Sequence, residues 1–223
     1  MTAIKVSHIL SLMTIVTAPA RRRRRQPDEL RHEAIIAARE LLVTDGPSSI
    51  TLQAVAAALG MTHGSITHHF GAAANLQAAV ADGLIEQLLT EVRTGTSALK
   101  AGVIAEADLV DLVFDTFEQT GIGKLIGWLS ATHSPLLQPL FERFSRLSGE
   151  IAGDREEGSA FTQTELPMII ESVVIPALGS ALIGSGLLQA LNISPNCTRH
   201  RVARDLAVAR ELRIAVSRAN LPD

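Results

Sequence analysis

The stretch Thr51 to Phe70, TLQAVAAALGMTHGSITHHF, does most to determine how this chain folds. Its pattern predicts two short helices joined by a tight turn. Thr51 can cap the first helix with its hydroxyl, and apolar residues three and four apart give that helix one apolar face. Gly60 ends it, because glycine readily takes the left-handed conformation, and Thr62 can cap a second helix, His63 to His69. Such a pair is typical of the helix-turn-helix unit, whose second helix enters the major groove of DNA.

A longer helix is predicted upstream, from Pro27 to Asp45. Pro27 suits its first turn, the two acidic residues that follow complement the positive end of the helix dipole, and Gly46 comes directly after its end. The apolar residues of this segment fall on one face: Leu30, Ala34, Ile35, Ala38, Leu41 and Leu42. Three helices with this pattern make a compact module in which the first two support the third.

Residues 28–88 resemble the N-terminal domain of the TetR (tetracycline-repressor-like) family of bacterial regulators. The family's spaced small, apolar and His-Phe positions are matched without a gap by Ala37, Ala38, Gly46, Thr51, Val55, Ala56, Gly60, Gly64, Ile66, His69 and Phe70, and Leu76 fits the position that opens the next helix. The resemblance implies an all-α fold with a DNA-binding domain at 28–88, whose helix-turn-helix is 51–70. It also implies a larger helical domain at 89–223 for ligand binding and dimerisation.

The second helix of the pair and its flanks supply the candidate DNA contacts. These are Thr51, Thr62, His63, Gly64, Ser65, Thr67 and His68. Hydroxyl groups and helix N-termini can hydrogen-bond phosphates, and histidines add positive charge at mildly acidic pH. The alternative for the histidines is a partly exposed polar surface, with His69 and Phe70 packed against the first helix.

Two departures from the family pattern concern charge. Thr67 stands where the family usually has Tyr, and Ala73 where it usually has Lys; both usual residues commonly contact phosphate. From Gly46 through Val80 the chain has no Lys, Arg, Asp or Glu at all. Because phosphate contacts supply much of the affinity for DNA, the sequence predicts an electrostatically weak reader.

A run of five arginines, Arg21, Arg22, Arg23, Arg24 and Arg25, is the candidate source of the missing charge. Placed just before the first helix, it can act as an arm that follows the DNA backbone or enters the minor groove. The alternative is a solubilising tail, since such a run is always solvated. Residues 1–80 hold eight Lys/Arg and five Asp/Glu, against twelve and eighteen in 81–223, as expected for a basic reader joined to an acidic body.

Residues 1–26 are predicted to form a disordered extension that carries this arm. The apolar run Ile9 to Ala18 faintly resembles a secretory signal, but it is short, broken by hydroxyl residues, and followed by the arginines. Cys197 is the only cysteine, so no disulfide can form within the chain. This favours a cytoplasmic protein.

The chain remains helical in pattern after Phe70, and no strand-like alternation stands out. Amphipathic segments are predicted at 75–99, 106–120, 124–133, 136–147 and 199–218, with a loop at 149–164. The stretch 172–198 holds no charge and is apolar nearly all round. It is long enough for a membrane span, but a homodimer interface buries it equally well, and the resemblance implies a dimer without a membrane.

No catalytic or metal-binding motif is found. The sequence lacks a P-loop, a Gly-x-Ser-x-Gly and an HExxH, and His68-His69 has no partner at metal-ligand spacing. We therefore expect no enzyme activity, no cofactor and no metal.

The resemblance implies a homodimeric transcription regulator, which we interpret as a repressor released from a palindromic operator by a small-molecule effector. The candidate pocket residues are Phe114, Phe117, Trp128, His133, Phe141 and Met168, each of which fits a plain core equally well. The alternative function is a dimeric ligand-sensing or interaction protein whose DNA reader is degenerate.

Overall fold

The computed structural model describes residues 27–153 and 166–219, and these are almost entirely helical. The helices are α1 (Pro27–Asp45), α2 (Leu52–Ala58), α3 (His63–Phe70), α4 (Ala73–Lys100), α5 (Glu106–Gln119), α6 (Ile122–Ala131), α7 (Leu137–Gly153), α8 (Leu166–Gly179), α9 (Ser185–Ala190) and α10 (Cys197–Ala219), with a short 3-10 turn η1 (Pro47–Ser49) and a π-helical turn η2 (Ser180–Gly184). The described residues contain no strand, and the predicted all-α fold is confirmed.

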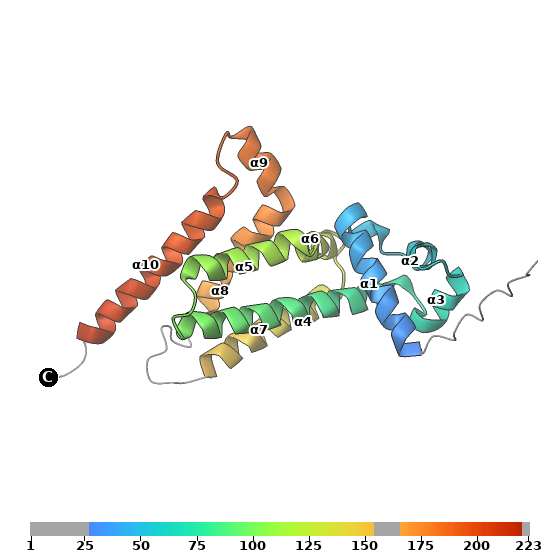
Figure 1. Cartoon of the computed structure of the whole chain (residues 1–223), viewed down its shortest axis with the longest axis horizontal. Helices are drawn as coiled ribbons and strands as arrows, with labels where there is room; N and C mark the ends of the chain where they lie inside the picture. Colours follow the sequence, from blue (N-terminus) through green and yellow to red (C-terminus); the bar gives the residue numbers. More distant parts are fainter. Residues whose placement is uncertain (1–26, 154–165, 220–223) are drawn as a thin grey trace, which may run out of the picture.

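Helices α1, α2 and α3 form a small lobe at one end of the molecule, while α10 lies at the opposite end and α9 projects at the top of the view (Figure 1). Helix α4 packs against α1 near its start and against α5 and α7 further along. It runs unbroken through residue 88, where the sequence suggested a domain boundary. One apolar core, with Val55, Ile66, Leu84 and Phe117 all buried, extends through both parts. A displacement in the larger part can therefore reach the small lobe through packed side chains.

Helix α7 continues through Gly149 to Gly153, so the predicted loop over 149–164 is wrong for its first five residues. Gly149 costs a helix about 1 kcal/mol relative to alanine, which is not enough to end it. Arg93 Nε on α4 also forms an ion pair with Glu150 Oε2 on α7, at 3.0 Å. This pair attaches α7 to α4 immediately after Gly149. The rest of the predicted loop lies outside the described residues.

The long apolar stretch is helical but not regular. Pro176 lies inside α8 and cannot donate a backbone hydrogen bond, and the helix widens into the π-turn η2 one turn later. The Ser180 hydroxyl in η2 donates to Glu118 Oε1 on α5 at 2.7 Å, which attaches this irregular segment to the core.

Arg199 holds the N-terminal half of helix α10 against α5. Arg199, whose side chain is 15% exposed, pairs with Asp115 at 2.6 Å, with Glu118 at 2.5 Å and with Asp111 at 3.6 Å. Its guanidinium also lies over the ring of Phe114. Burial alone would lower the pKa of Arg199, but its hydrogen bonds to the carboxylates raise it. Arg199 thus stays charged and fixes the N-terminal half of α10.

Candidate functional site

Local capping fixes both helices of the predicted helix-turn-helix. Thr51 Oγ1 accepts a hydrogen bond from Ala54 N at 3.1 Å, and Thr62 Oγ1 accepts one from Ser65 N at 3.3 Å. Between the helices, Gly60 has φ near +60°, a conformation that favours glycine, and Met61 N donates back to Ala56 O at 2.8 Å. The turn between α2 and α3 therefore follows directly from its sequence.

Helix α3 has one buried face and one open face. Ile66 and Phe70 are buried against the other helices of the lobe. Thr62, His63, Gly64 and His68 are exposed, while Ser65, Thr67 and His69 are half-buried. The structure thus brings the predicted contacts of this helix together on one accessible surface. Thr51 is also exposed, but it lies at the start of α2.

The hydroxyl groups on this surface bond within the helix. Thr67 Oγ1 donates to the carbonyl of His63 at 2.9 Å, and the hydroxyls of Thr62 and Ser65 lie 2.9 Å apart. These bonds fix the orientation of the side chains and leave acceptor lone pairs available to solvent or a ligand. The surface is therefore polar and ordered, but it holds no fixed charge.

Gly64 has no structural role within the described residues. A Cβ atom built at this position would meet nothing within 4 Å, and the backbone is helical without a positive φ. Alanine would stabilise an exposed helix position by about 1 kcal/mol. The backbone of α3 is therefore open to solvent at Gly64.

The small lobe is poor in positive charge. Residues 27–80 contain two arginines and five Asp/Glu. Arg31 lies over the ring of Phe70 at 4.8 Å, and Arg39 donates to Gln87 on α4. The predicted arm, Arg21 to Arg25, lies outside the described residues.

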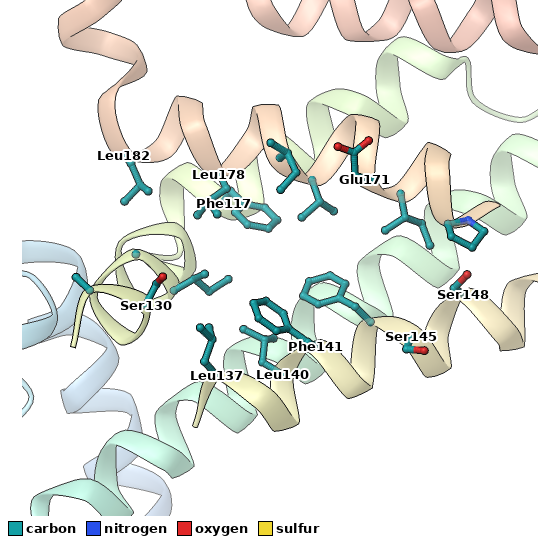
Figure 2. A pocket seen from close by; sticks show the side chains of 18 residues that line it. Phe117, Ser130, Leu137, Leu140, Phe141, Ser145, Ser148, Glu171, Leu178 and Leu182 are labelled. Atoms are coloured by element: carbon teal, nitrogen blue, oxygen red, sulfur yellow. The ribbon is translucent and has the colours of Figure 1, made fainter. Parts of the chain in front are cut away.

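A pocket of about 700 Å³ opens between α6, α7 and α8 (Figure 2). Its walls are mainly apolar, and the few polar lining residues are Ser130, Ser145, Ser148 and Glu171. The volume lies within the range typical of pockets for small organic molecules.

The six candidate pocket residues lie in different environments. Phe117 and Phe141 line the pocket. Phe114 is fully buried under Arg199, and Trp128 is half-buried against the core. His133 is exposed in the turn after α6, and Met168 is exposed on α8.

Sequence reasoning missed the polar part of this pocket. Ser145 and Ser148 on α7 and Glu171 on α8 all line the pocket (Figure 2). Their spacing of three residues places the two serines on one side of α7, and this was the available signal. Which side would face α8 depends on how the two helices pack, and the sequence does not determine this.

Helix α6 connects the pocket to the small lobe. Gly127 on α6 lines the pocket, and a Cβ there would lie 2.7 Å from Leu182 of η2. At the other end of α6, Gly121 packs so closely on α1 that a Cβ would lie 2.9 Å from Leu42. Lys124 Nζ also donates to the carbonyl of Val43, at the C-terminal end of α1, at 3.4 Å.

A second connection consists of hydrogen bonds. Arg39 on α1 donates to Gln87 Oε1 on α4, and Gln87 Nε2 donates to Glu91 Oε1 at 2.9 Å. The buried hydroxyl of Thr116 on α5 donates to Glu91 Oε2 at 2.5 Å. Thr116 precedes the pocket residue Phe117, so this series of bonds joins the pocket wall to the small lobe.

The outer face of α8, η2 and α9 is apolar and uncovered. The segment Pro167–Ala190 is long and apolar enough to cross a membrane, with a mean hydropathy of 1.7, and only 11% of its most apolar window is buried. Met168 and Ile183 are 69% and 65% exposed, and Leu187 and Leu191 are also exposed. On α10, Val208 and Leu212 are exposed as well. Such an extended apolar surface marks an interaction site.

Comparisons with known proteins agree with this geometry. Residues 35–80 match the family model described as "Bacterial regulatory proteins, tetR family". The N-terminal part of the chain is therefore similar to this family. No curated protein sequence matches the chain.

Solved structures extend the TetR likeness to the rest of the fold. A protein from Mesorhizobium loti MAFF303099, described as a TetR-family transcriptional regulator, shares 15% identity at a TM-score of 0.61, covering 86% of this chain and 98% of its own. The multidrug binding protein EbrR, complexed with imidazole, shares 20% identity at a TM-score of 0.55, covering 79% and 94%. A TetR-family regulator from Rhodococcus sp. shares 16% identity at 0.51, covering 82% and 99%. At these identities the likeness establishes the fold, which is that of TetR-family regulators.

Proposed function

We propose that this protein is a homodimeric repressor that binds a palindromic operator through α3 and leaves it when a small molecule occupies the pocket. The observation that carries the proposal is the open face of α3, where Gly64 leaves room for close approach. The TetR-type domain and fold support it. We place the protein in the cytoplasm, where its DNA and its effector meet and where the single Cys197 needs no partner.

The arginine arm supplies most of the attraction to the DNA backbone in this proposal. The helix-turn-helix has polar groups but no Lys or Arg, and Arg31 and Arg39 already contact Phe70 and Gln87 within the fold. Phosphate contacts supply the sequence-independent part of affinity. We therefore assign positioning to the arm and base contacts to Ser65, Thr67 and the neighbouring exposed side chains of α3.

Dimerisation covers the apolar face of α8, η2 and α9 with the same face of a second copy. A closed two-fold interface buries both surfaces at once and places two copies of α3 on one side of the DNA. The adjacent α10 adds its exposed Val208 and Leu212 to the interface. The spacing of the two α3 helices is then set by the relative orientation of the protomers, and only one spacing matches two half-sites.

Helix α6 transmits occupancy of the pocket to the DNA-binding lobe. A ligand between α7 and α8 presses on Leu182 of η2, which has no free space against Gly127 of α6. Because α6 also packs tightly on Leu42 of α1, its displacement rotates the small lobe. The ligand thereby favours a conformation in which the two α3 helices no longer match the operator.

A second candidate function keeps the dimer and the pocket without DNA binding. The observation in its favour is the net negative charge of residues 27–80, which contain five acidic residues and only two arginines. In that case the protein senses a ligand or binds another protein, and its helix-turn-helix is a structural remnant.

Electrophoretic mobility shift with DNA flanking the protein's own gene separates the two candidates. We expect the wild type to shift this DNA, and a variant with Ser65→Glu and Thr67→Glu to lose the shift because two carboxylates face the phosphates. The control is Thr94→Glu with Ser97→Glu on α4, which makes the same two changes of residue type at exposed positions of a helix outside the small lobe. Equal binding by both double variants would remove α3 from the interface, and no shift by the wild type would favour the second candidate.

A further inference from the structure

Among the described residues that line the pocket, one is charged. Glu171 lies on α8 at the exposed edge of the pocket, and the part of the lining that the structure describes includes no lysine, arginine or histidine. Within residues 27–153 and 166–219, the carboxylate of Glu171 takes part in no hydrogen bond or ion pair. By contrast, Glu150 on α7 pairs with an arginine of α4. Glu171 is therefore a negative charge available to a ligand.

The remaining lining suits an apolar and aromatic body. Phe117, Phe141 and Phe144 contribute three rings, and Leu140 and Leu178 add aliphatic surface around them (Figure 2). The faces of aromatic rings carry partial negative charge and attract organic cations within about 6 Å. The serines on α7 can accept or donate hydrogen bonds without adding charge. Carboxylate and rings thus favour the same sign of charge in the ligand.

We infer that the pocket binds an amphipathic organic cation, with its apolar body between α7 and α8 and its ammonium group beside Glu171. The inference rests on the effector pocket of the proposed function and adds the chemical class of the effector. An organic anion in the same position would place a second negative charge beside Glu171, and the described lining residues include no cation to compensate it. A neutral molecule of equal size would gain the apolar contacts alone.

A matched set of ligands tests this inference on the full chain. Isothermal titration calorimetry is carried out with phenylbutyl-trimethylammonium, phenylbutanol and phenylbutyrate, which share an apolar body and differ in charge. We expect the wild type to bind the cation about fivefold more tightly than the alcohol, the factor expected of one partly exposed ion pair, and to bind the acid least. In Glu171→Gln the cation and the alcohol should bind alike.

The control is Glu142→Gln, an exposed residue of α7 outside the pocket that carries the same change of charge. It should keep the preference of the wild type for the cation. The inference is overturned if the wild type binds none of the three, if it prefers the alcohol or the acid, or if Glu171→Gln retains the preference. Mobility shift of the same proteins is recorded separately, so a protein that binds the cation but no DNA would contradict the proposed repressor and leave the ligand class standing.

Discussion

At the scale of single residues, Gly64 is the position where stability and function make opposite demands. Alanine is a better helix former, and the structure has space for its methyl group. We predict that Gly64→Ala raises the free energy of unfolding by up to about 1 kcal/mol, and yet weakens DNA binding because the methyl group occupies the space of the DNA backbone.

Urea denaturation and mobility shift on the same preparation check both parts of this prediction. Gly83→Ala on α4 is the matched control, since it too is helical and meets nothing within 4 Å. It should gain stability and bind DNA as the wild type does. If Gly64→Ala also leaves DNA binding unchanged, close approach at this position is not required.

Residue-level features of the reader were predictable because they are local. The caps Thr51 and Thr62 accept hydrogen bonds from backbone N–H groups three residues away. Gly60 is glycine because its own φ angle is positive. The pocket depends on packing between helices distant in sequence. For this reason the sequence does not indicate Glu171, and it indicates Trp128 only through its residue type.

At the scale of helices, the contact of α6 with η2 leaves no room for a side chain at Gly123. A Cβ there would lie 2.5 Å from the Cβ of Ala181 and 2.9 Å from the carbonyl of Phe117. We predict that Gly123→Ala lowers the free energy of unfolding by about 1–3 kcal/mol through overpacking. Because α6 also contacts α1, operator affinity should change without any ligand.

Gly149→Ala on α7 provides the comparison, since its added methyl group meets nothing. It should be neutral or stabilising in urea denaturation and silent in mobility shift. A Gly123→Ala variant that matches Gly149→Ala in both measurements would show that α6 tolerates displacement.

The ion pair between Glu106 on α5 and Arg210 on α10, at 2.6 Å, makes the attachment of α10 dependent on pH. Burial alone would raise the pKa of Glu106, but the hydrogen bond and charge of Arg210 lower it below 4.5. A lowered pKa in the folded state means that the stabilisation is complete above the unfolded value and is lost as pH falls through the folded value.

We therefore predict that Glu106→Gln lowers the Tm at neutral pH by about 2–4 °C, which corresponds to about 1 kcal/mol in a chain of this size. The difference from wild type should shrink as pH falls below about 4.5. Thermal melts across this range measure it. A difference that stays constant down to strongly acidic pH would mean that Glu106 acts by packing rather than by charge.

Helix positions along the chain followed from periodicity, and α1 was placed at its observed bounds. The end of α7 was not predicted correctly, because the glycine and acidic residues there are typical of loops. The ion pair between Arg93 and Glu150 is visible only in three dimensions. The π-turn η2 also had no clear signal beyond Pro176 and the surrounding glycines.

At the scale of the whole molecule, the exposed face of α8 and η2 is the proposed dimer interface. Ile183 points away from its own protomer, so a charge there should leave the protomer folded. We predict that Ile183→Arg gives monomers, because an unpaired guanidinium would be desolvated in the interface. Sedimentation velocity of the wild type should show dimers.

Val103→Arg controls for the loss of an apolar side chain from the surface, since Val103 is 76% exposed between α4 and α5. It should sediment as the wild type does. A monomeric wild type, or Ile183→Arg dimers as stable as those of Val103→Arg, would place the interface elsewhere or remove it.

Selection of binding sites from a random DNA library tests the central claim, two-fold recognition of DNA by a pair of α3 helices, most directly. The account predicts that the wild type enriches an inverted repeat whose half-site centres lie about one helical turn, ~34–36 Å, or a multiple of it apart. The variant with Ser65→Glu and Thr67→Glu should enrich nothing. Enrichment of no repeat by the wild type, or of the same sequences by both proteins, would contradict the account.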